Sequence, residues 1–352
     1  MTQLDNFTDG IMIGKASFPR QSSVMVDIMN INGPEYKDQN PVESINSYLK
    51  DENGLIIDTY PRYWHGYITF LRPLLIFWDL SDIRLFNLLL HALSQIIIIL
   101  LFAKRKLFRQ AFFYQVGLLY LSPWSIAFSL QYSSVYYIFQ FSVMAILFFY
   151  ESLSEKNLFA YLFFLIGILT SYFDLLTYPV ATFGFPFATL IILDHYLSKS
   201  KSIFSYIYDF FFWISGYATF WASKWILSSI FLDENIILDA FESISTRSSN
   251  FKGDQILSYM DVFAKNISLY FNKPILIFTI ALVFLSLYLI FKSKPRPQVT
   301  FQDMIPFILL MLLPALWYLG ARNHSYIHSW FTYRSLSLSI TSLFFMLSIL
   351  IK

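Results

Sequence analysis

The fold is decided first by residues 85–106, which read LFNLLLHALSQIIIILLFAKRK. The run from Leu85 to Phe102 contains no Lys, Arg, Asp or Glu, and a basic cluster that begins at Lys104 follows it. An apolar stretch of about 20 residues has the length of a helix that crosses a bilayer. A basic run at one end of such a helix is typical of the cytoplasmic side. Residues 85–106 therefore predict a membrane-spanning helix.

Similar apolar stretches recur along the rest of the chain and predict further spans. They are Ala111–Leu130, Val135–Tyr150, Leu158–Phe173, Val180–Leu193, Tyr206–Trp221, Pro274–Phe291, Met304–Leu319 and Ser335–Ile351. We expect an all-α fold, a polytopic membrane helix bundle with about nine spans. The turns near Gln131 and Asp174 are short, so eight crossings are the alternative count.

The composition agrees with a membrane protein and excludes several other classes. Of 352 residues, 56% are hydrophobic and only 14% are charged, against about 25% charged in soluble domains. The net charge of +2 is too small for a nucleic-acid-binding surface. The chain has no cysteine, which excludes disulfides, thiolate zinc sites and a cysteine nucleophile. We expect a lipid bilayer as a partner and no nucleic acid.

Basic residues alternate between the connections and predict the orientation. The connections after the first, third, fifth and seventh spans, with the C-terminus, form one side. That side holds Lys104, Arg105, Lys106, Arg109, Lys156, Lys199, Lys201, Lys292, Lys294, Arg296 and Lys352. The short connections at 131–134 and 174–179 hold no Lys or Arg. We therefore expect a multi-pass protein of the plasma membrane with a cytoplasmic C-terminus and an exterior active face.

This orientation divides the chain into two parts. Residues 1–84 form an exterior loop with juxtamembrane helices, and residues 85–352 form the transmembrane bundle, with exterior loops at 226–273 and 320–334. The polar segment 1–84 has no apolar stretch able to export it, so we expect a membrane-spanning helix to precede Met1. The alternative is that the segment is translocated by the helix behind it.

Ionisable residues near hydrocarbon are costly and therefore informative, and here they gather on the predicted exterior side. Asp5 and Asp9 lie near the mouth of the expected preceding helix. A carboxylate there can act as a base toward a sugar hydroxyl. The structural alternative is an Asp that caps the short helix starting near Ile11.

A second group lies around Ile68–Trp78, an apolar stretch too short to span a bilayer, which we interpret as an interfacial helix. Arg62, His65 and Arg72 flank it or lie within it, and arginine binds phosphate oxygens in pairs. They are candidates for holding a lipid phosphate. The alternative is an aromatic belt with snorkelling arginines.

Two later segments complete the predicted site. Asp174 lies in a tight turn between spans and is a second carboxylate candidate. In the late loop we expect Arg322, His324, His328 and Arg334 to grip a phosphate or pyrophosphate. His324 and His328 are one helical turn apart, but no acidic third ligand lies next to them, so no metal site is predicted. No cofactor is indicated either, although a divalent metal remains compatible.

The loop 233–273 contains an amphipathic stretch around Asp254–Phe271. Ile256, Met260, Phe263 and Ile267 fall on one stripe of a helix drawn there. That stripe predicts an interfacial or lid helix.

With many spans, an acidic residue in the first exterior loop, interfacial helices and a late loop with Arg and His, the chain resembles the GT-C superfamily of integral-membrane glycosyltransferases. The resemblance is architectural and covers most of the chain. It implies a polyprenyl-phosphate-linked sugar as donor and a glycan acceptor. It also implies that Asp9, with Asp5 as the fallback, is the catalytic base. The chain departs from the family in lacking the first helix and the tandem acidic pair found in several branches.

The activity that this resemblance implies is inverting transfer of a sugar to a cell-surface glycan or lipid-linked acceptor. Asp174 would orient the acceptor while arginines and histidines hold the leaving phosphate. Two alternative functions stay open, and a third possibility is an inactive remnant. One is a polysaccharide polymerase or ligase, in which the late-loop arginines are central. The other is a lipid-glycan flippase, which would need ionisable groups deep in several spans.

Overall fold

The computed structural model describes residues 4–197, 201–253, 255–271, 273–293 and 299–351. Helices make up most of this part of the chain, which confirms the all-α class. Two short two-stranded sheets, which the sequence analysis did not predict, are the exceptions. One sheet lies in the N-terminal segment before the first long apolar helix, and the other lies between α11 (Ile203–Leu232) and α14 (Lys273–Lys292).

The N-terminal segment folds into short helices around a small hairpin. Its elements are α1 (Asn6–Ser17), α2 (Val24–Asn30), β1 (Gly33–Glu35), α3 (Pro41–Leu49), β2 (Ile56–Asp58) and α4 (Ile68–Phe77). The strands are antiparallel, with Gly33 opposite Asp58. Helix α4 matches the predicted short apolar helix. Asp79, which follows it, caps the next helix by accepting hydrogen bonds from the backbone N–H groups of Ser81 and Asp82.

The long helices follow the predicted apolar stretches. They are α5 (Leu80–Lys104), α6 (Phe108–Leu119), α8 (Leu130–Glu155), α9 (Phe159–Phe173), α10 (Val180–Tyr196), α11 (Ile203–Leu232), α14 (Lys273–Lys292), α15 (Phe301–Gly320) and α18 (Leu336–Ile349). Among the described residues, four helices are long and apolar enough to cross a membrane, namely α5, α8, α14 and α15. Helices α4, α9 and α10 are apolar but shorter. The count of nine spans stays a prediction.

One predicted span is not a single helix. The stretch Ala111–Leu130 comprises most of α6, a break, and the short helix α7 (Pro123–Ile126). Ser122 at the break has a φ of 57°, a left-handed conformation that no helix continues through. Pro123 then starts α7. Leu130 is the first residue of α8, so the connection lies at 120–129 and not at 131–134 as predicted.

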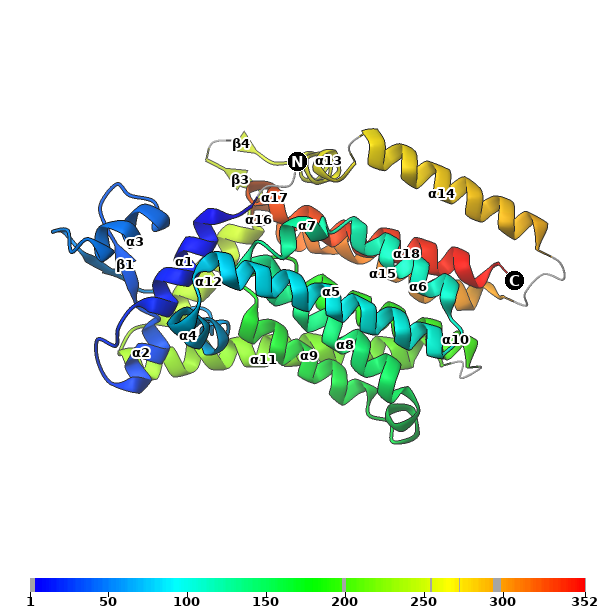
Figure 1. Cartoon of the computed structure of the whole chain (residues 1–352), viewed down its shortest axis with the longest axis horizontal. Coiled ribbons are helices and arrows are strands. Elements are labelled where there is room, and N and C mark those ends of the chain that lie inside the picture. The colour runs from blue at the N-terminus through cyan, green and yellow to red at the C-terminus, as the bar shows by residue number, and fades with distance from the viewer. Residues whose placement is uncertain (1–3, 198–200, 254, 272, 294–298, 352) are drawn as a thin grey trace.

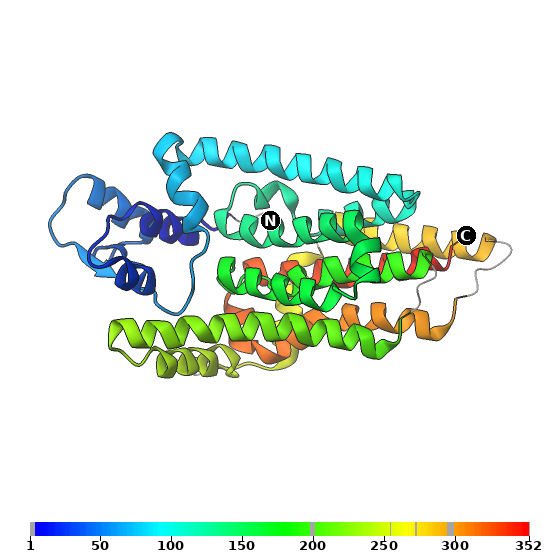
Figure 2. The ribbon, with the colours of Figure 1, turned by 90° about the horizontal axis from the view of Figure 1, so that it is seen from below.

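The long helices run side by side, with α5 along one edge and α11 along the opposite edge (Figure 2). Helix α10 is the most enclosed, because all its residues from Val180 to Asp194 are buried. A helix that is apolar all round belongs inside a bundle. Helix α14 lies at the outside (Figure 1), with Ile277 and Phe284 each about two-thirds exposed.

The segment after α11 is a layer of short elements. It holds α12 (Ile236–Ser248), a hairpin of β3 (Phe251–Lys252) and β4 (Gln255–Ile256), and α13 (Tyr259–Tyr270). The predicted amphipathic helix is therefore shorter than expected, with Ile256 in a strand. Met260 and Ile267 are exposed, whereas Val262 and Asn266 are buried. The predicted apolar stripe is thus largely an outward face.

The late loop is also helical, formed by α16 (Arg322–Ile327), α17 (Ser329–Thr332) and a 3-10 turn, η1 (Tyr333–Ser335). The bundle has two distinct ends (Figure 1). We call the end that carries α1, α12 and α16 the polar end. We call the other end, where α5 and α8 finish, the basic end, since Lys104, Lys106 and Lys156 lie there. Of the predicted cytoplasmic residues, Lys199, Lys294, Arg296 and Lys352 lie outside the described part.

Helices α9 and α11 pack backbone to backbone through two glycines. A Cβ at Gly167 would lie 2.2 Å from the carbonyl oxygen of Trp213, and one at Gly216 would lie 2.1 Å from that of Phe164. Small residues of this kind allow close approach of helices in apolar surroundings.

We therefore expect Gly167→Ala to destabilise the bundle, because the added methyl group forces α9 and α11 apart. A loss of about 1–3 kcal/mol is the scale of such overpacking. Thermal unfolding in detergent measures it. The matched control is Gly320→Ala, because a Cβ at Gly320 meets nothing within 4 Å. Equal melting temperatures for the two variants would contradict the close crossing.

Candidate functional site at the polar end

The loop before α4 is fastened to the end of α9. The backbone N–H of Gly66 donates to the carbonyl of Tyr172 at 2.8 Å. A Cβ at Gly66 would lie 2.4 Å from the Tyr172 ring, so only glycine fits. His65 before it has a φ of 51°, in the left-handed region. This contact brings the buried Tyr63 ring near the turn that holds Asp174. Burial raises the pKa of Tyr63, and Tyr60 and the charge of Asp174 raise it further.

Asp174 ends α9 and is buried. Its Oδ1 accepts a hydrogen bond from the backbone N–H of Thr177 at 2.9 Å. Its Oδ2 is buried without a hydrogen-bond partner among the described residues. Burial raises the pKa of Asp174 to about 6, and the N–H groups of the turn oppose that rise. Asp174 therefore has an open acceptor oxygen and exchanges a proton near neutral pH.

Asp5 and Asp9 both belong to the start of α1 and are buried. Asp5 caps the helix by accepting from the backbone N–H of Thr8 at 3.0 Å, and it also accepts from Trp330 Nε1 at 3.2 Å. An aspartate therefore caps a helix here, as the alternative role predicted, but the cap is Asp5 and the helix begins at Asn6, not near Ile11. Its bond to Trp330 ties α1 to the late loop.

Asp9 is held by α8. Its Oδ1 accepts from the Ser129 hydroxyl at 3.2 Å and from the backbone N–H of Leu130 at 3.0 Å. Its Oδ2 lies 3.4 Å from an Arg84 guanidinium nitrogen. Burial raises the pKa of Asp9 to about 6, although the charge of Arg84 opposes the rise. Both carboxylate oxygens of Asp9 are therefore engaged, unlike those of Asp174.

His324 and His328 lie together as their spacing predicted, with ring centroids 4.8 Å apart. His324 Nε2 donates to the carbonyl of Leu176 at 2.8 Å, in the same turn that contains Asp174. The Nδ1 atoms of both rings are buried without a hydrogen-bond partner within the described ranges. Burial lowers the pKa of His324 to about 3 and lowers that of His328. Both imidazoles are therefore neutral.

Arg334 is fully buried in the same region. Its guanidinium donates to the carbonyls of Leu121 and Trp330 and to the Ser125 hydroxyl. It lies over the Tyr132 ring, 3.9 Å from the centroid. Because its donors bind the protein itself, Arg334 links the α6–α7 break to the late loop.

Arg247, near the end of α12, was missed by the sequence analysis. Its guanidinium lies over the Tyr63 ring, 5.6 Å from the centroid. Helix α12 packs against α16, which carries His324, and the charge of Arg247 adds to the effect of burial in lowering the pKa of both His324 and His328. The described residues include no carboxylate within ion-pair distance of it. The available signal was a single charge in the otherwise uncharged run SISTRSSN, residues 243–250.

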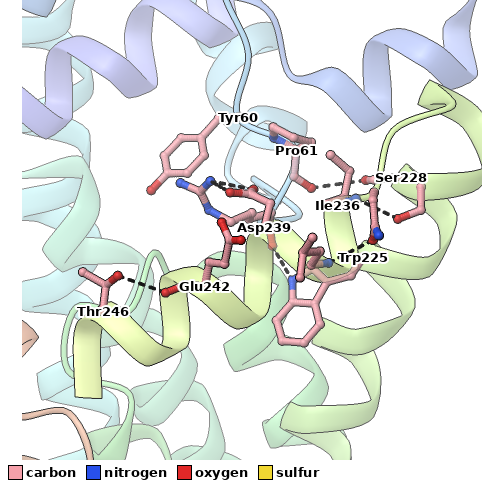
Figure 3. Close-up of polar contacts among 12 residues, drawn as sticks. Tyr60, Pro61, Trp225, Ser228, Ile236, Asp239, Glu242 and Thr246 are labelled. Carbon is pink, nitrogen blue, oxygen red and sulfur yellow. Dashed lines mark hydrogen bonds and ion pairs between the residues drawn. The ribbon is translucent and has the colours of Figure 1, made fainter. Parts of the chain in front are cut away.

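Four other predicted phosphate ligands are engaged elsewhere. Arg62 binds both oxygens of Asp239 on α12, at 2.7 and 3.0 Å, so its charge is paired. Figure 3 shows Asp239 and Tyr60 around this contact. Arg72 donates to the carbonyl of Ala16 at 2.7 Å and stabilises the end of α1.

The remaining two are held by aromatic neighbours. Arg322 stacks on Tyr259, 3.7 Å from the ring centroid. His65 is buried, and its Nε2 donates to the carbonyl of Tyr60 while its Nδ1 accepts from the Tyr67 hydroxyl. Burial holds the pKa of His65 well below its usual value, and the charges of Lys15 and Lys224 add to this effect. His65 is therefore neutral and has the contacts of a positioning residue.

The structure thus brings together Asp174, the histidine pair, Tyr63 and Arg247, which we call the polar cluster. Asp5 borders it, because Asp5 accepts a hydrogen bond from Trp330 Nε1 and the Trp330 ring lies 5.0 Å from that of His328, centroid to centroid. The described residues contain no group of three or more His, Cys, Asp or Glu side chains able to hold a metal. Chemically, the polar cluster offers a proton acceptor, two neutral imidazoles and one cation.

No protein-family model matches the chain, and no curated protein or solved structure matches it either. The geometry of the site and the physical chemistry of its residues therefore carry the functional argument.

The raised pKa of Asp174 makes a prediction about stability. The unfolded carboxyl ionises at about 3.8 and the folded one at about 6, so the folded state binds more protons between these values. The contribution of Asp174 to the free energy of unfolding therefore falls by up to about 3 kcal/mol as the pH rises through this interval. Melting curves in detergent at several pH values should show a smaller fall for Asp174→Asn than for the unsubstituted protein.

The control is Glu52→Gln, at an exposed position remote from the polar cluster. It should keep the pH dependence of the unsubstituted protein. Identical pH dependence in Asp174→Asn and Glu52→Gln would mean that the folded-state pKa of Asp174 is not raised.

Proposed function

We propose that this chain is a membrane glycosyltransferase that moves a sugar from a polyprenyl-phosphate carrier to a glycan or lipid-linked acceptor, with inversion. The observation that carries the proposal is the polar cluster at one end of an apolar helix bundle. A carrier of this kind has an apolar tail and a charged phosphate, so its reacting bond would lie at the end of the bundle. The unpartnered buried atoms of Asp174, His324 and His328 support a ligand there.

The basic residues support the sidedness of this proposal. Lys104, Lys106 and Lys156 lie at the basic end, opposite the polar cluster. Positive charge is retained on the cytoplasmic side of membrane proteins. The polar end would then face the exterior of the plasma membrane, where cell-surface glycans are assembled.

In the proposed reaction, the acceptor hydroxyl oxygen attacks the anomeric carbon of the sugar. The bond from that carbon to the carrier phosphate oxygen breaks, and the phosphate leaves with the electron pair. The hydroxyl proton passes to a carboxylate. Asp9 is the base that the resemblance to GT-C enzymes implies, but Asp174 Oδ2 is the oxygen that is open to accept a proton.

Arg247 and the histidine pair are proposed to hold the leaving phosphate. Arg247 supplies fixed positive charge, which stabilises the phosphate most as the bond breaks and so lowers the barrier. His328 can supply one N–H donor, whereas the single N–H of neutral His324 binds the carbonyl of Leu176 and positions the late loop beside Asp174. No metal or cofactor enters the scheme.

We expect the one of Asp174→Asn and Asp9→Asn that removes the base to lower transfer by about 10²–10⁴-fold, the scale of general-base catalysis. Arg247→Gln should lower it by about 10²–10³-fold, the scale for losing one charge-stabilising donor. The measurement is the sugar content of surface glycans, by mass spectrometry, in cells whose chromosomal copy carries each substitution.

Arg20→Gln is the matched control, because Arg20 is exposed and lies at the far end of α1. Membrane levels of every variant are quantified on blots. Unchanged glycans in Asp174→Asn and Arg247→Gln, at normal protein levels, would remove the polar cluster from the scheme. Activity lost in only one Asp variant would identify the base.

A polysaccharide polymerase or ligase is the second candidate, in which the late loop, with its arginines and the two histidines whose Nδ1 atoms are open, would be central and Asp9 dispensable. In that case, His324→Gln and His328→Gln should shorten the polysaccharide while Asp9→Asn leaves its length unchanged. Gel electrophoresis of the extracted polysaccharide distinguishes the cases. For a transferase of single sugars, chain length should stay constant in all three variants while side-group content falls.

A further inference from the structure

A cavity of about 220 Å³ lies on the side of α1 away from the long helices, between α1, α3 and the β1–β2 hairpin. Phe7, Gly10 and Gly14 of α1 line it. Asp9 and Met12 of the same helix are buried toward the bundle, in contact with α8 and the core beside α4. Helix α1 therefore separates the cavity from Asp9.

The cavity lies among the short elements of the N-terminal segment and not between the long apolar helices. Helix α3 and the β1–β2 hairpin project beyond the start of α5 in both views, whereas α11 extends as far as α2 and contacts it (Figures 1 and 2). Because the exposed Glu35 belongs to its lining, the cavity is open to the surface, and a polar ligand can enter it.

The polar lining excludes an anionic ligand. Lys15 is the cation of the lining, and its Nζ already donates to Asp58 at 2.7 Å and to the carbonyl of Ile31 at 3.0 Å. Asp58 and Glu35 contribute two carboxylates. Gln39 Oε1 is buried and has no hydrogen-bond partner in the described part of the chain. These groups present hydrogen-bond acceptors, and hydroxyl groups are suitable donors to them.

The other part of the lining is apolar. Phe7 is 59% exposed, and Ile11 and Ile45 are half-buried beside it. A cavity that combines an exposed aromatic ring with carboxylate and amide acceptors suits a molecule with hydroxyl groups at its edge and C–H groups on its face. A sugar ring has this distribution of groups.

We propose that this cavity is a carbohydrate subsite that binds a neutral sugar residue of the acceptor glycan. This role rests on the proposed function. Because α1 stands between the cavity and Asp9, the bound residue is not the one that reacts. The subsite instead holds the glycan at a distance from the reacting hydroxyl and selects acceptors that are long enough to reach it.

The test is saturation-transfer NMR on the purified full chain in nanodiscs. The probes are glucose, galactose, N-acetylglucosamine and a linear trisaccharide of each. We expect NMR saturation to pass from the protein to at least one probe. Binding of that probe should be about tenfold weaker in Gln39→Ala, the scale for losing one hydrogen bond. Ile11→Trp, which fills the cavity, should abolish binding.

Glu52→Gln is the matched control outside the cavity and should bind as the unsubstituted protein does. Absence of an NMR saturation signal on every probe would overturn the proposal. Probe binding that is unaffected by Gln39→Ala and Ile11→Trp would also overturn it. Stronger binding of ethanolamine than of any sugar would also overturn it, since the carboxylates would then form a site for a cation.

The binding measurement requires neither carrier nor transfer, so it is independent of the proposed activity. Asp174→Asn should keep full sugar binding. Loss of glycosyl transfer with retained sugar binding would concern the polar cluster alone. Loss of sugar binding with retained glycosyl transfer would rule out only the subsite.

Discussion

The long apolar helices impose the constraint on which the rest of the structure depends. Because their surfaces are apolar, polar side chains lie either at the ends of the bundle or in its interior. In the interior, every polar group needs a hydrogen-bond partner. Most buried polar groups obey this rule, as Arg334 does with its three donated hydrogen bonds. Asp174 Oδ2 and the open nitrogens of His324 and His328 do not. Other buried polar atoms without a partner among the described residues are spread along the long helices, such as His91 Nε2 and Gln140 Nε2, but these three lie together at one end, which is the reason for treating that end as a functional site.

Short elements around the polar end hold these exceptions in place. The contact between Gly66 and Tyr172 brings Tyr63 near Asp174, and the bond from His324 to Leu176 joins the late loop to the same turn. The ion pair of Arg62 with Asp239 fastens α12, which carries Arg247. Three segments that are far apart in the sequence thus meet around one carboxylate.

The sequence predicted the helices well, because an apolar stretch reports the environment of a helix directly. It failed at the α6–α7 break, where Ser122 and Pro123 interrupt an apolar run. It also assigned Arg62 and Arg72 to a ligand, although Asp239 and the end of α1 hold them. Pairing across long sequence separations leaves no local pattern, and for the same reason Arg247 and the cavity beside α1 were missed.

The central claim is that α1, α12 and α16 share one aqueous face of the membrane. The chain has no cysteine, so single cysteines introduced at Glu52, Ser245, Tyr326, Lys106 and Asn157 can be labelled with a membrane-impermeant maleimide in intact and permeabilised cells. The account predicts labelling of the first three in intact cells and of the last two only after permeabilisation. Labelling of Ser245→Cys and Tyr326→Cys from opposite sides would contradict it, since no common site could then form.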